Sequence, residues 1–398
     1  MLTSSKTRDN SAAAGEPKGF LAELWDAVSL RAAGLIIGVL ALQVGFILSY
    51  VGAFHAPAPH RIPIAVAAPA QVSAQLVPKL NAIPSAPVHA TAVSGEAAAR
   101  RLIRADSVSS ALIVNPAGTT DTLLVASAAG AAQATATEQV MTSAEARQHR
   151  LVTVTDVVPV QRGDARGLTG FYLVIGWLVG GYLVASLLGV ASGGRPATIR
   201  RAIFRLLTVV PYAVVSGLAG AIVAGPVLGA LTGHLIALWW LGALLVFVAA
   251  AATMAFQVLF GVLGIGITVL VFVILGTPSA GGAYQAPLLP PFWRALSSAL
   301  PNGAGLGAVR RIVYFGANGI SGDLIVIGIY ALAGIIVTLA GSIFFRRRAN
   351  AVQQPTAALS ARTGGEVTDG RFPLAAAPTA PRAAARVPGA EGARGHGT

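Results

Sequence analysis

Long apolar runs separated by short polar stretches dominate the pattern of this chain. Between Arg205 and Arg294 there is no Asp, Glu, Lys or Arg, and Leu, Val, Ala, Ile, Gly and Phe make up most of the stretch. A bilayer core of about 30 Å requires roughly 20 apolar residues for each helical crossing. The stretch therefore predicts three membrane-spanning helices, at residues 206–231, 235–256 and 258–275.

Three further apolar runs, at 33–54, 169–190 and 323–345, each have the length of one crossing. A cleaved signal peptide is the alternative for the first run. That run is longer than a usual signal-peptide core and follows a polar N-terminal segment, so a retained helix is favoured. The pattern predicts six crossings in all.

Small residues recur at four-residue spacing at Gly225, Gly229 and Gly233. Such spacing lets two helix backbones approach closely. In a chain with 46 Gly the spacing also arises by chance. Close helix packing at these positions is one of two interpretations.

Residues 55–168 show a different pattern, in which short strands alternate with helices. This alternation predicts a small α/β domain, and the segment is long enough to bury its own core. The predicted strands are 61–66, 88–93, 111–114, 122–126 and 151–158, and the predicted helices are 73–83, 96–104 and 130–150.

Basic residues decide the expected topology. The loop at 191–205 carries Arg195, Arg200, Arg201 and Arg205 and no acidic residue, and such short basic loops stay cytoplasmic. This predicts a multi-pass protein of the cell membrane with both termini in the cytoplasm. The fold class is then an all-α six-helix transmembrane bundle with an inserted extracytoplasmic α/β domain between helices 1 and 2.

One external segment, 277–322, is basic where the rule expects few positive charges. It contains two short amphipathic stretches, 290–300 and 305–315, which are too short to span a bilayer. We expect them to re-enter the membrane or to lie on its outer face, with aromatic side chains at headgroup depth and the arginines reaching water. The residues concerned are Trp293, Arg294, Arg310, Arg311, Tyr314 and Phe315.

Both ends of the chain differ from the apolar runs. Phe20, Leu24 and Trp25 recur at helical spacing and predict an amphipathic lead-in helix, which either lies on lipid headgroups or docks a cytoplasmic partner. The tail is rich in Ala, Pro, Gly and Arg and is expected to be disordered. The predicted organisation is 1–32 cytoplasmic N-terminus with the lead-in helix, 33–54 transmembrane helix 1, 55–168 extracytoplasmic domain, 169–346 transmembrane helices 2–6 with external amphipathic helices at 288–315, and 347–398 disordered cytoplasmic tail.

Composition agrees with a membrane protein, since 55% of the 398 residues are hydrophobic, 11% are charged and the mean hydropathy is +0.70. The net charge of +13 is explained by basic loops beside apolar runs and contact with anionic lipid, so a nucleic-acid partner is not expected. The absence of Cys excludes thiol catalysis and zinc–thiolate sites.

Motifs for catalysis and cofactor binding are missing. There is no phosphate-binding loop, no His-Glu-x-x-His and no Gly-x-Ser-x-Gly, so we expect no catalytic, cofactor or metal site and no enzymatic activity in this chain. A metal at His55 and His60 is conceivable, but linker histidines are commoner. The predicted spans contain no internal carboxylate, and Asp323 lies only at the mouth of the last; an ion-coupled pump is therefore disfavoured.

Several stretches resemble the permease subunits of type-2 ABC exporters, a group that includes actinobacterial permeases and phage-infection-protein-like chains. The strand Ile-Pro-Ile-Ala-Val at 62–66 and the helix and strand at 95–114 resemble elements of their external domain. The stretch Pro-Pro-Phe-Trp-Arg-Ala-Leu-Ser-Ser-Ala-Leu-Pro-Asn-Gly at 290–303 is similar to their paired external helices. The match covers about residues 20–346, and the long coiled-coil insertion of many phage-infection proteins is missing.

The resemblance implies partners and sites. A separate ATPase subunit would contact the lead-in helix and the 191–205 loop, at Phe20, Leu24, Trp25, Arg200 and Arg201, and a second permease copy, identical or related, would complete the path through the lipid bilayer. The external gate would be formed by Phe292, Trp293, Arg294, Arg310 and Arg311. The expected function is export of an amphipathic or lipid-like substrate. The alternatives are a non-transporting envelope scaffold or receptor and, less favoured, an enzyme acting on lipid or glycan.

Overall fold

The computed structural model describes residues 30–193 and 198–363, and its described residues up to Arg346 belong to one compact unit. Within the described part, five helices are long and apolar enough to cross a membrane. The protein is therefore a helical, multi-pass membrane protein. The five helices are α2 (Leu30–Phe54), α6 (Thr169–Ser192), α7 (Ile199–Ile222, continued by a π-helical segment Val223–Val227), α8 (Leu235–Phe260) and α13 (Ser321–Thr363, apolar over Ser321–Arg347).

The predicted span at 258–275 differs from what the structure contains. Helix α8 continues to Phe260 and ends at Gly261, whose φ of 64° is a left-handed conformation that glycine adopts without strain. A 17-residue apolar segment, Leu263–Ser279, follows as α9 (Leu263–Val269), the π-helical η4 (Leu270–Leu275) and α10 (Gly276–Ser279). It is shorter than the five candidate spans, so the structure supports five of the six predicted crossings.

The ends of the segment Leu263–Ser279 lie at opposite ends of the neighbouring helices. At its start, Gly264 packs against the backbone of Phe256 near the end of α8. Gln257 in turn donates to the Ala185 carbonyl of α6 at 3.2 Å. Just beyond its other end, the Gly281 carbonyl accepts a hydrogen bond from Arg310, close to the α/β domain.

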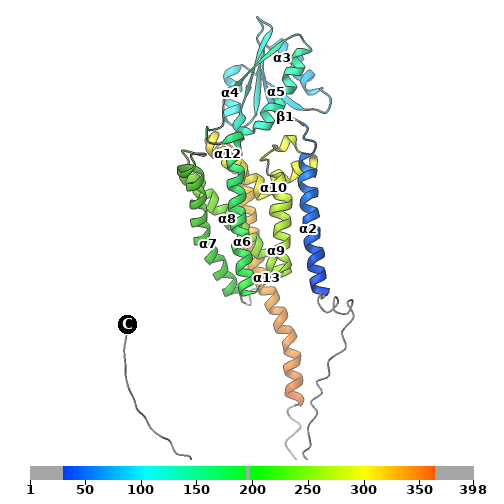
Figure 1. Cartoon of the computed structure of the whole chain (residues 1–398), viewed down its shortest axis with the longest axis vertical. Coiled ribbons are helices and arrows are strands. Elements are labelled where there is room, and N and C mark those ends of the chain that lie inside the picture. Colours follow the sequence, from blue (N-terminus) through cyan, green and yellow to red (C-terminus); the bar gives the residue numbers. More distant parts are fainter. Residues whose placement is uncertain (1–29, 194–197, 364–398) are drawn as a thin grey trace, which may run out of the picture. The chain divides into compact units, whose positions relative to one another are not determined.

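The α/β domain contains every strand and helix that the sequence predicted, each within a few residues of the expected position. One five-stranded sheet has the order β2-β1-β3-β4-β5, in which only β3 and β4 pair antiparallel. Figure 1 shows the helices packed beside it. The elements are β1 (Ile62–Ala67), α3 (Ala70–Asn81), β2 (Val88–Val93), α4 (Glu96–Arg104), β3 (Ser110–Ile113), β4 (Thr120–Val125), α5 (Ala131–Ala146) and β5 (Leu151–Asp156).

Each face of this sheet has its own hydrophobic core. Helices α3 and α5 cover one face, where Leu288 from the segment before the last span is also buried. Helix α4 covers the other face, where Phe315 is buried. Both cores of the domain are therefore completed by a side chain that comes from the segment between α10 and α13.

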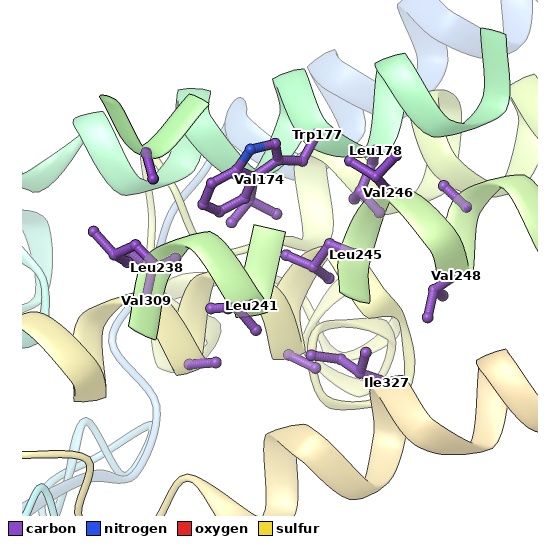
Figure 2. Packing of buried hydrophobic residues seen from close by; sticks show 14 of the residues in the cluster. Val174, Trp177, Leu178, Leu238, Leu241, Leu245, Val246, Val248, Val309 and Ile327 are labelled. Carbon is purple, nitrogen blue, oxygen red and sulfur yellow. The ribbon is translucent and has the colours of Figure 1, made fainter. Parts of the chain in front are cut away.

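Helix α8 is the centre of the membrane bundle. Side chains from α6, α8, α12 (Pro301–Tyr314) and α13 meet in one cluster, and Figure 2 shows Trp177 of α6 and Val309 of α12 directed toward α8. A Cβ at Gly181 of α6 would overlap the Val246 carbonyl oxygen, and one at Gly217 of α7 would overlap the Ala243 backbone nitrogen. These glycines let α6 and α7 approach α8 closely.

The glycines that the sequence singled out for helix packing have another role. A Cβ at Gly229 or Gly233 would meet no atom within 4 Å, and both residues have positive φ. They belong to the turn between α7 and α8, where a left-handed backbone favours glycine. The interpretation as chance spacing therefore holds at Gly229 and Gly233, because four-residue spacing does not identify which helix face meets a neighbour.

Helix α13 is longer than expected. The sequence predicted a disordered tail over 347–398, whereas the structure continues the helix to Thr363. Ala is favourable in helices, and five of residues 347–363 are Ala, which favours the helix despite Pro355. The remaining tail lies outside the described residues.

Candidate functional site at the junction of the α/β domain and the helices

Two short helices precede the last span, as the sequence predicted. Helix α11 (Pro291–Ala299) and helix α12 each begin with a proline, which suits the first helical position because its missing N–H would have no helical partner there. Of the two predicted arrangements, re-entry into the membrane or a position on its outer face, an exposed position on the outer face does not fit α12. Most of that helix is buried against α6 and α8.

The predicted gate residues on α11 face different surroundings. Phe292 is 58% exposed, whereas Trp293 is buried beside Ala53 at the end of α2. Arg294 donates hydrogen bonds to the carbonyls of Ala286 and Leu289, at 3.3 and 2.9 Å. Phe292 is thus the exposed residue of the three. Trp293 packs against α2, and Arg294 binds the loop at 286–289.

Arg311 joins three parts of the chain. Its Nε donates to the Asp106 carboxylate at 2.9 Å, and its Nη1 donates to the Asp323 carboxylate. Asp106 follows α4 in the α/β domain, and Asp323 lies in the first turn of α13. The side chain was expected to reach water, but it forms a bridge between the domain and the last span.

Burial shifts the pKa of the two bridge residues that lie outside the membrane spans, Asp106 and Arg311. It raises the pKa of the Asp106 carboxyl, and Arg311 offsets part of that rise. For Arg311 itself, burial disfavours the charge, but the carboxylates of Asp323 and Asp106 outweigh this and raise its pKa. The charged pair is therefore maintained by mutual contact, and removal of one partner would leave the other poorly hydrated.

Arg310, the neighbouring residue, is less well satisfied. Its Nη2 donates to the Gly281 carbonyl at 3.0 Å, and its Nε is buried with no hydrogen-bond partner among the described residues. Burial lowers the pKa of the guanidinium to about 10, because nearby carboxylates, chiefly Asp106 and Asp164, compensate only part of the lost hydration.

A second link ties the exit of the domain to α12. The Tyr314 hydroxyl donates to Asp164 Oδ2 at 2.6 Å, and the Thr169 amide donates to Asp164 Oδ1 at 2.8 Å. Asp164 thereby satisfies an amide at the start of α6. Burial and the hydrogen bond to Asp164 raise the pKa of Tyr314.

A cavity of about 510 Å³ lies beside the bridge. Residues of the α/β domain, the segment around Gly281 and one face of α12 line it. Asp106, Arg310, Arg311 and Asp323 all border this space. The junction therefore combines charged groups with an accessible volume.

Sequence reasoning found Arg310 and Arg311 but missed Asp106 and Asp164. An available signal was the charge of the segment 277–322, which has three arginines and no acidic residue. Partners for buried arginines had to come from elsewhere in the chain. Asp106 and Asp164 belong to the only large charged segment predicted for the same side of the membrane.

The predicted ATPase-docking residues are not part of this junction. Arg200 and Arg201 are exposed in the first turn of α7, where the Thr198 hydroxyl caps the helix by accepting from the Arg201 amide at 3.3 Å. They are on this helix, whereas the sequence placed them in a loop. Arg205 donates to the Ser192 and Gly193 carbonyls at the end of α6, both at 2.8 Å. Phe20, Leu24 and Trp25 lie outside the described residues.

A second polar cluster lies inside the α/β domain. Arg150 binds Asp121, with its Nη2 at 2.5 Å from Oδ1, and approaches Glu145 at 3.8 Å. Burial and the Asp121 carboxylate raise the pKa of Glu145 to about 7, and Arg150 offsets part of this. A cavity of about 420 Å³ adjoins the cluster.

No group of three His, Cys, Asp or Glu that could hold a metal ion occurs in the described part of the chain. His55, one of two candidate linker histidines, has its Nδ1 at 2.9 Å from the Val51 carbonyl.

Comparison with models of protein families, with characterised proteins and with solved structures gave no match for this chain. The architecture and the junction are therefore the features of the chain that indicate a function.

Proposed function

We propose that this chain is the membrane-spanning permease subunit of an ATP-driven exporter in the cell membrane, with ATP hydrolysis supplied by a separate subunit. The observation that carries the proposal is the order of its parts. A first span is followed by an α/β domain, then by further spans, and two short helices packed near the domain precede the last span. Type-2 ABC exporter permeases resemble the chain in this order.

Six crossings are part of the proposal, with Leu263–Ser279 as the fifth in chain order. This segment connects the α6–α7 end of the helices to the α/β end, which supports a crossing. Its 17 residues extend about 25 Å at roughly 1.5 Å per residue, slightly less than a bilayer core of about 30 Å. The basic α7 start then lies in the cytoplasm and the α/β domain outside.

The topology is tested by thiol labelling, because the chain contains no Cys. Val262 and Ala317 are exposed, in the turns before α9 and before α13. On intact cells, a membrane-impermeant maleimide should label an Ala317→Cys variant and should label a Val262→Cys variant only after the membrane is opened. Equal labelling of both in intact cells would contradict six crossings.

The absence of acid groups inside the described spans favours an external energy source. Asp323 is the one carboxylate in the five candidate spans, and Arg311 occupies it. Proton and ion relays in membranes depend on such groups. An apolar path suits an amphipathic or lipid-like substrate, and two permease copies would form that path by alternating access. The bridge from Asp106 through Arg311 to Asp323 would transmit movement between the last span and the external domain.

Co-purification in mild detergent tests the ATPase partner. The wild-type chain should retain an ATPase from its native host, and a Arg200→Glu/Arg201→Glu variant should lose it, because both side chains are exposed at the proposed cytoplasmic surface. The matched control is Arg101→Glu/Arg104→Glu, which reverses two exposed charges on α4 of the α/β domain. Absence of any ATPase from the wild-type preparation would contradict the exporter proposal.

A non-transporting envelope scaffold or receptor is the second candidate function. Strand β5 is at the edge of the sheet and is largely exposed, and such an edge can pair with a strand of another protein. In this case the wild-type chain would be recovered with envelope proteins and without an ATPase.

A further inference from the structure

One face of α12 forms a wall of the junction cavity. Gly303, Gly307, Arg310 and Arg311 follow one another along this face at helical spacing, and all four line the cavity. A Cβ at Gly307 would come within 2.9 Å of an Asp323 carboxylate oxygen. A Cβ at Gly303 would lie 1.9 Å from the Ser297 carbonyl oxygen, so the two glycines let α11 and Asp323 approach α12 closely beside the cavity.

The charged groups that line the cavity are unequally paired. Both carboxylates that line the cavity, Asp106 and Asp323, bind Arg311. Asp164, the other nearby acid, accepts from the Tyr314 hydroxyl and the Thr169 amide. No described carboxylate lies within ion-pair distance of the Arg310 guanidinium, which donates to one acceptor among the described residues, the Gly281 carbonyl.

The Arg310 guanidinium therefore has an unpaired charge and unused N–H donors. A guanidinium carries five N–H donors. The Nε of Arg310 is enclosed by protein without a partner among the described residues, and Nη2 donates to the Gly281 carbonyl, so the donors left for a ligand in the cavity are the remaining N–H groups of Nη1 and Nη2. The guanidinium does not become neutral by losing a proton, because it remains protonated at physiological pH. A water molecule would satisfy the donor but not the charge. An anionic oxygen would satisfy both, through a hydrogen bond roughly twice as strong as a neutral one.

We propose that the junction cavity binds an anionic group, a phosphate or a carboxylate, whose oxygens accept hydrogen bonds from Arg310. The hydroxyl groups of Ser107 and Ser297 line the same cavity and supply further donors. The volume of about 510 Å³ lies within the range of about 300–1,000 Å³ usual for small-ligand sites. This inference depends on the junction geometry and not on the exporter function.

The anion has two possible sources, a small soluble molecule or the headgroup of an amphipathic molecule. Purified full-length protein in a neutral detergent is titrated with inorganic phosphate, lysophosphatidic acid, oleate and the uncharged monooleoylglycerol. Thermal unfolding is followed by the fluorescence of its five Trp. We expect at least one anion to raise the unfolding midpoint. Stabilisation by inorganic phosphate identifies a soluble source, and stabilisation by the charged lipids alone identifies a headgroup.

Variants decide whether Arg310 carries the binding. Arg310→Gln should weaken the apparent affinity for the active anion about ten- to hundred-fold, and Arg310→Lys, which retains the charge, should weaken it less. Arg205→Gln is the matched control, because that arginine likewise donates to backbone carbonyls, those of Ser192 and Gly193, and neither it nor these partners line the cavity. It should leave the affinity unchanged.

Three results would overturn the proposal. The first is that no anion stabilises the wild-type protein. The second is that monooleoylglycerol stabilises it as much as the charged lipids, a comparison that needs no variant and so remains decisive if Arg310→Gln fails to fold. The third is that the Arg310→Gln and Arg205→Gln variants bind the anion equally well.

Discussion

The two charge clusters of this protein, each partly buried, differ in how their charges are paired. Inside the α/β domain, one arginine, Arg150, serves two carboxylates, Asp121 and Glu145. At the junction, Arg311 binds both Asp106 and Asp323, and Arg310 is left without an ion pair among the described residues. The first cluster has more carboxylates than arginines, whereas the second has two of each lining its cavity but pairs them unequally.

The difference matters because an unpaired carboxyl and an unpaired guanidinium are neutralised in different ways. A buried carboxyl can take up a proton, and burial together with Asp121 raises the pKa of Glu145 to about 7. A guanidinium cannot lose its proton at physiological pH. The acid-rich cluster can therefore neutralise itself, whereas the unpaired arginine of the junction requires an acceptor from outside the cluster. The contrast also separates a cluster that stabilises one domain from a cluster that joins two.

The largest expected effect follows from removing the central arginine of the junction. An Arg311→Met variant would leave Asp106 and Asp323 without their cation, at side-chain exposures of 21% and 14%. Loss of one partner from a buried ion pair costs about 3 to 5 kcal/mol. We expect the free energy of unfolding to fall by about 3 kcal/mol, and hydrogen exchange to accelerate in α12 and in the loop after α4.

A surface pair provides the control for this variant. Arg100 and Glu96 lie four residues apart on α4, with side chains 36% and 50% exposed. Arg100→Met should change the free energy of unfolding by less than about 0.5 kcal/mol, because exposed pairs contribute little. An equally small change for Arg311→Met would show that the junction bridge is as weak as a surface pair.

A somewhat smaller effect is expected from the acid-rich cluster, and it depends on pH. The folded-state pKa of Glu145, about 7, exceeds its ordinary value of 4.5, so the folded protein binds this proton more tightly than the unfolded chain does. The free energy of unfolding should therefore decrease as pH rises from about 5 to 7, by up to about 2 to 3 kcal/mol. The measurement is the unfolding midpoint at several pH values.

Two variants sharpen this test. Glu145→Gln should remove most of the pH dependence and stabilise the protein at pH 8, because no buried charge forms. Glu138→Gln, at an exposed position of the same helix α5, should leave the pH dependence intact. A wild-type midpoint that does not change between pH 5 and 7 would contradict the raised pKa.

The α/β domain was predictable from the sequence because its signals are local. Strand β2, for example, has the boundaries that the alternating pattern predicted, Val88–Val93. The spans were equally clear, except for Leu263–Ser279, whose start depends on the positive φ of Gly261. Hydropathy alone does not indicate such a turn within a continuous apolar run.

The junction was only partly predictable, because its contacts join distant parts of the chain. Asp106 and Arg311 are 205 residues apart, and Asp164 and Tyr314 are 150 apart. Amphipathic spacing on α12 indicated a helix with a polar side, and a membrane surface was the simplest partner for it. The structure shows instead that the polar side of α12 faces the α/β domain and its other faces pack in the bundle.

A double-mutant cycle on Asp106 and Arg311 tests most directly whether the ion pair between these residues stabilises the contact between the α/β domain and the membrane helices. The free energy of unfolding is measured for the wild-type protein, Asp106→Asn, Arg311→Met and the double variant, in one detergent and at one pH. We predict a coupling energy of about 1 to 3 kcal/mol, as for contacting charged residues. Additive effects, within about 0.5 kcal/mol, would show that the two side chains do not interact and would contradict the account of the junction.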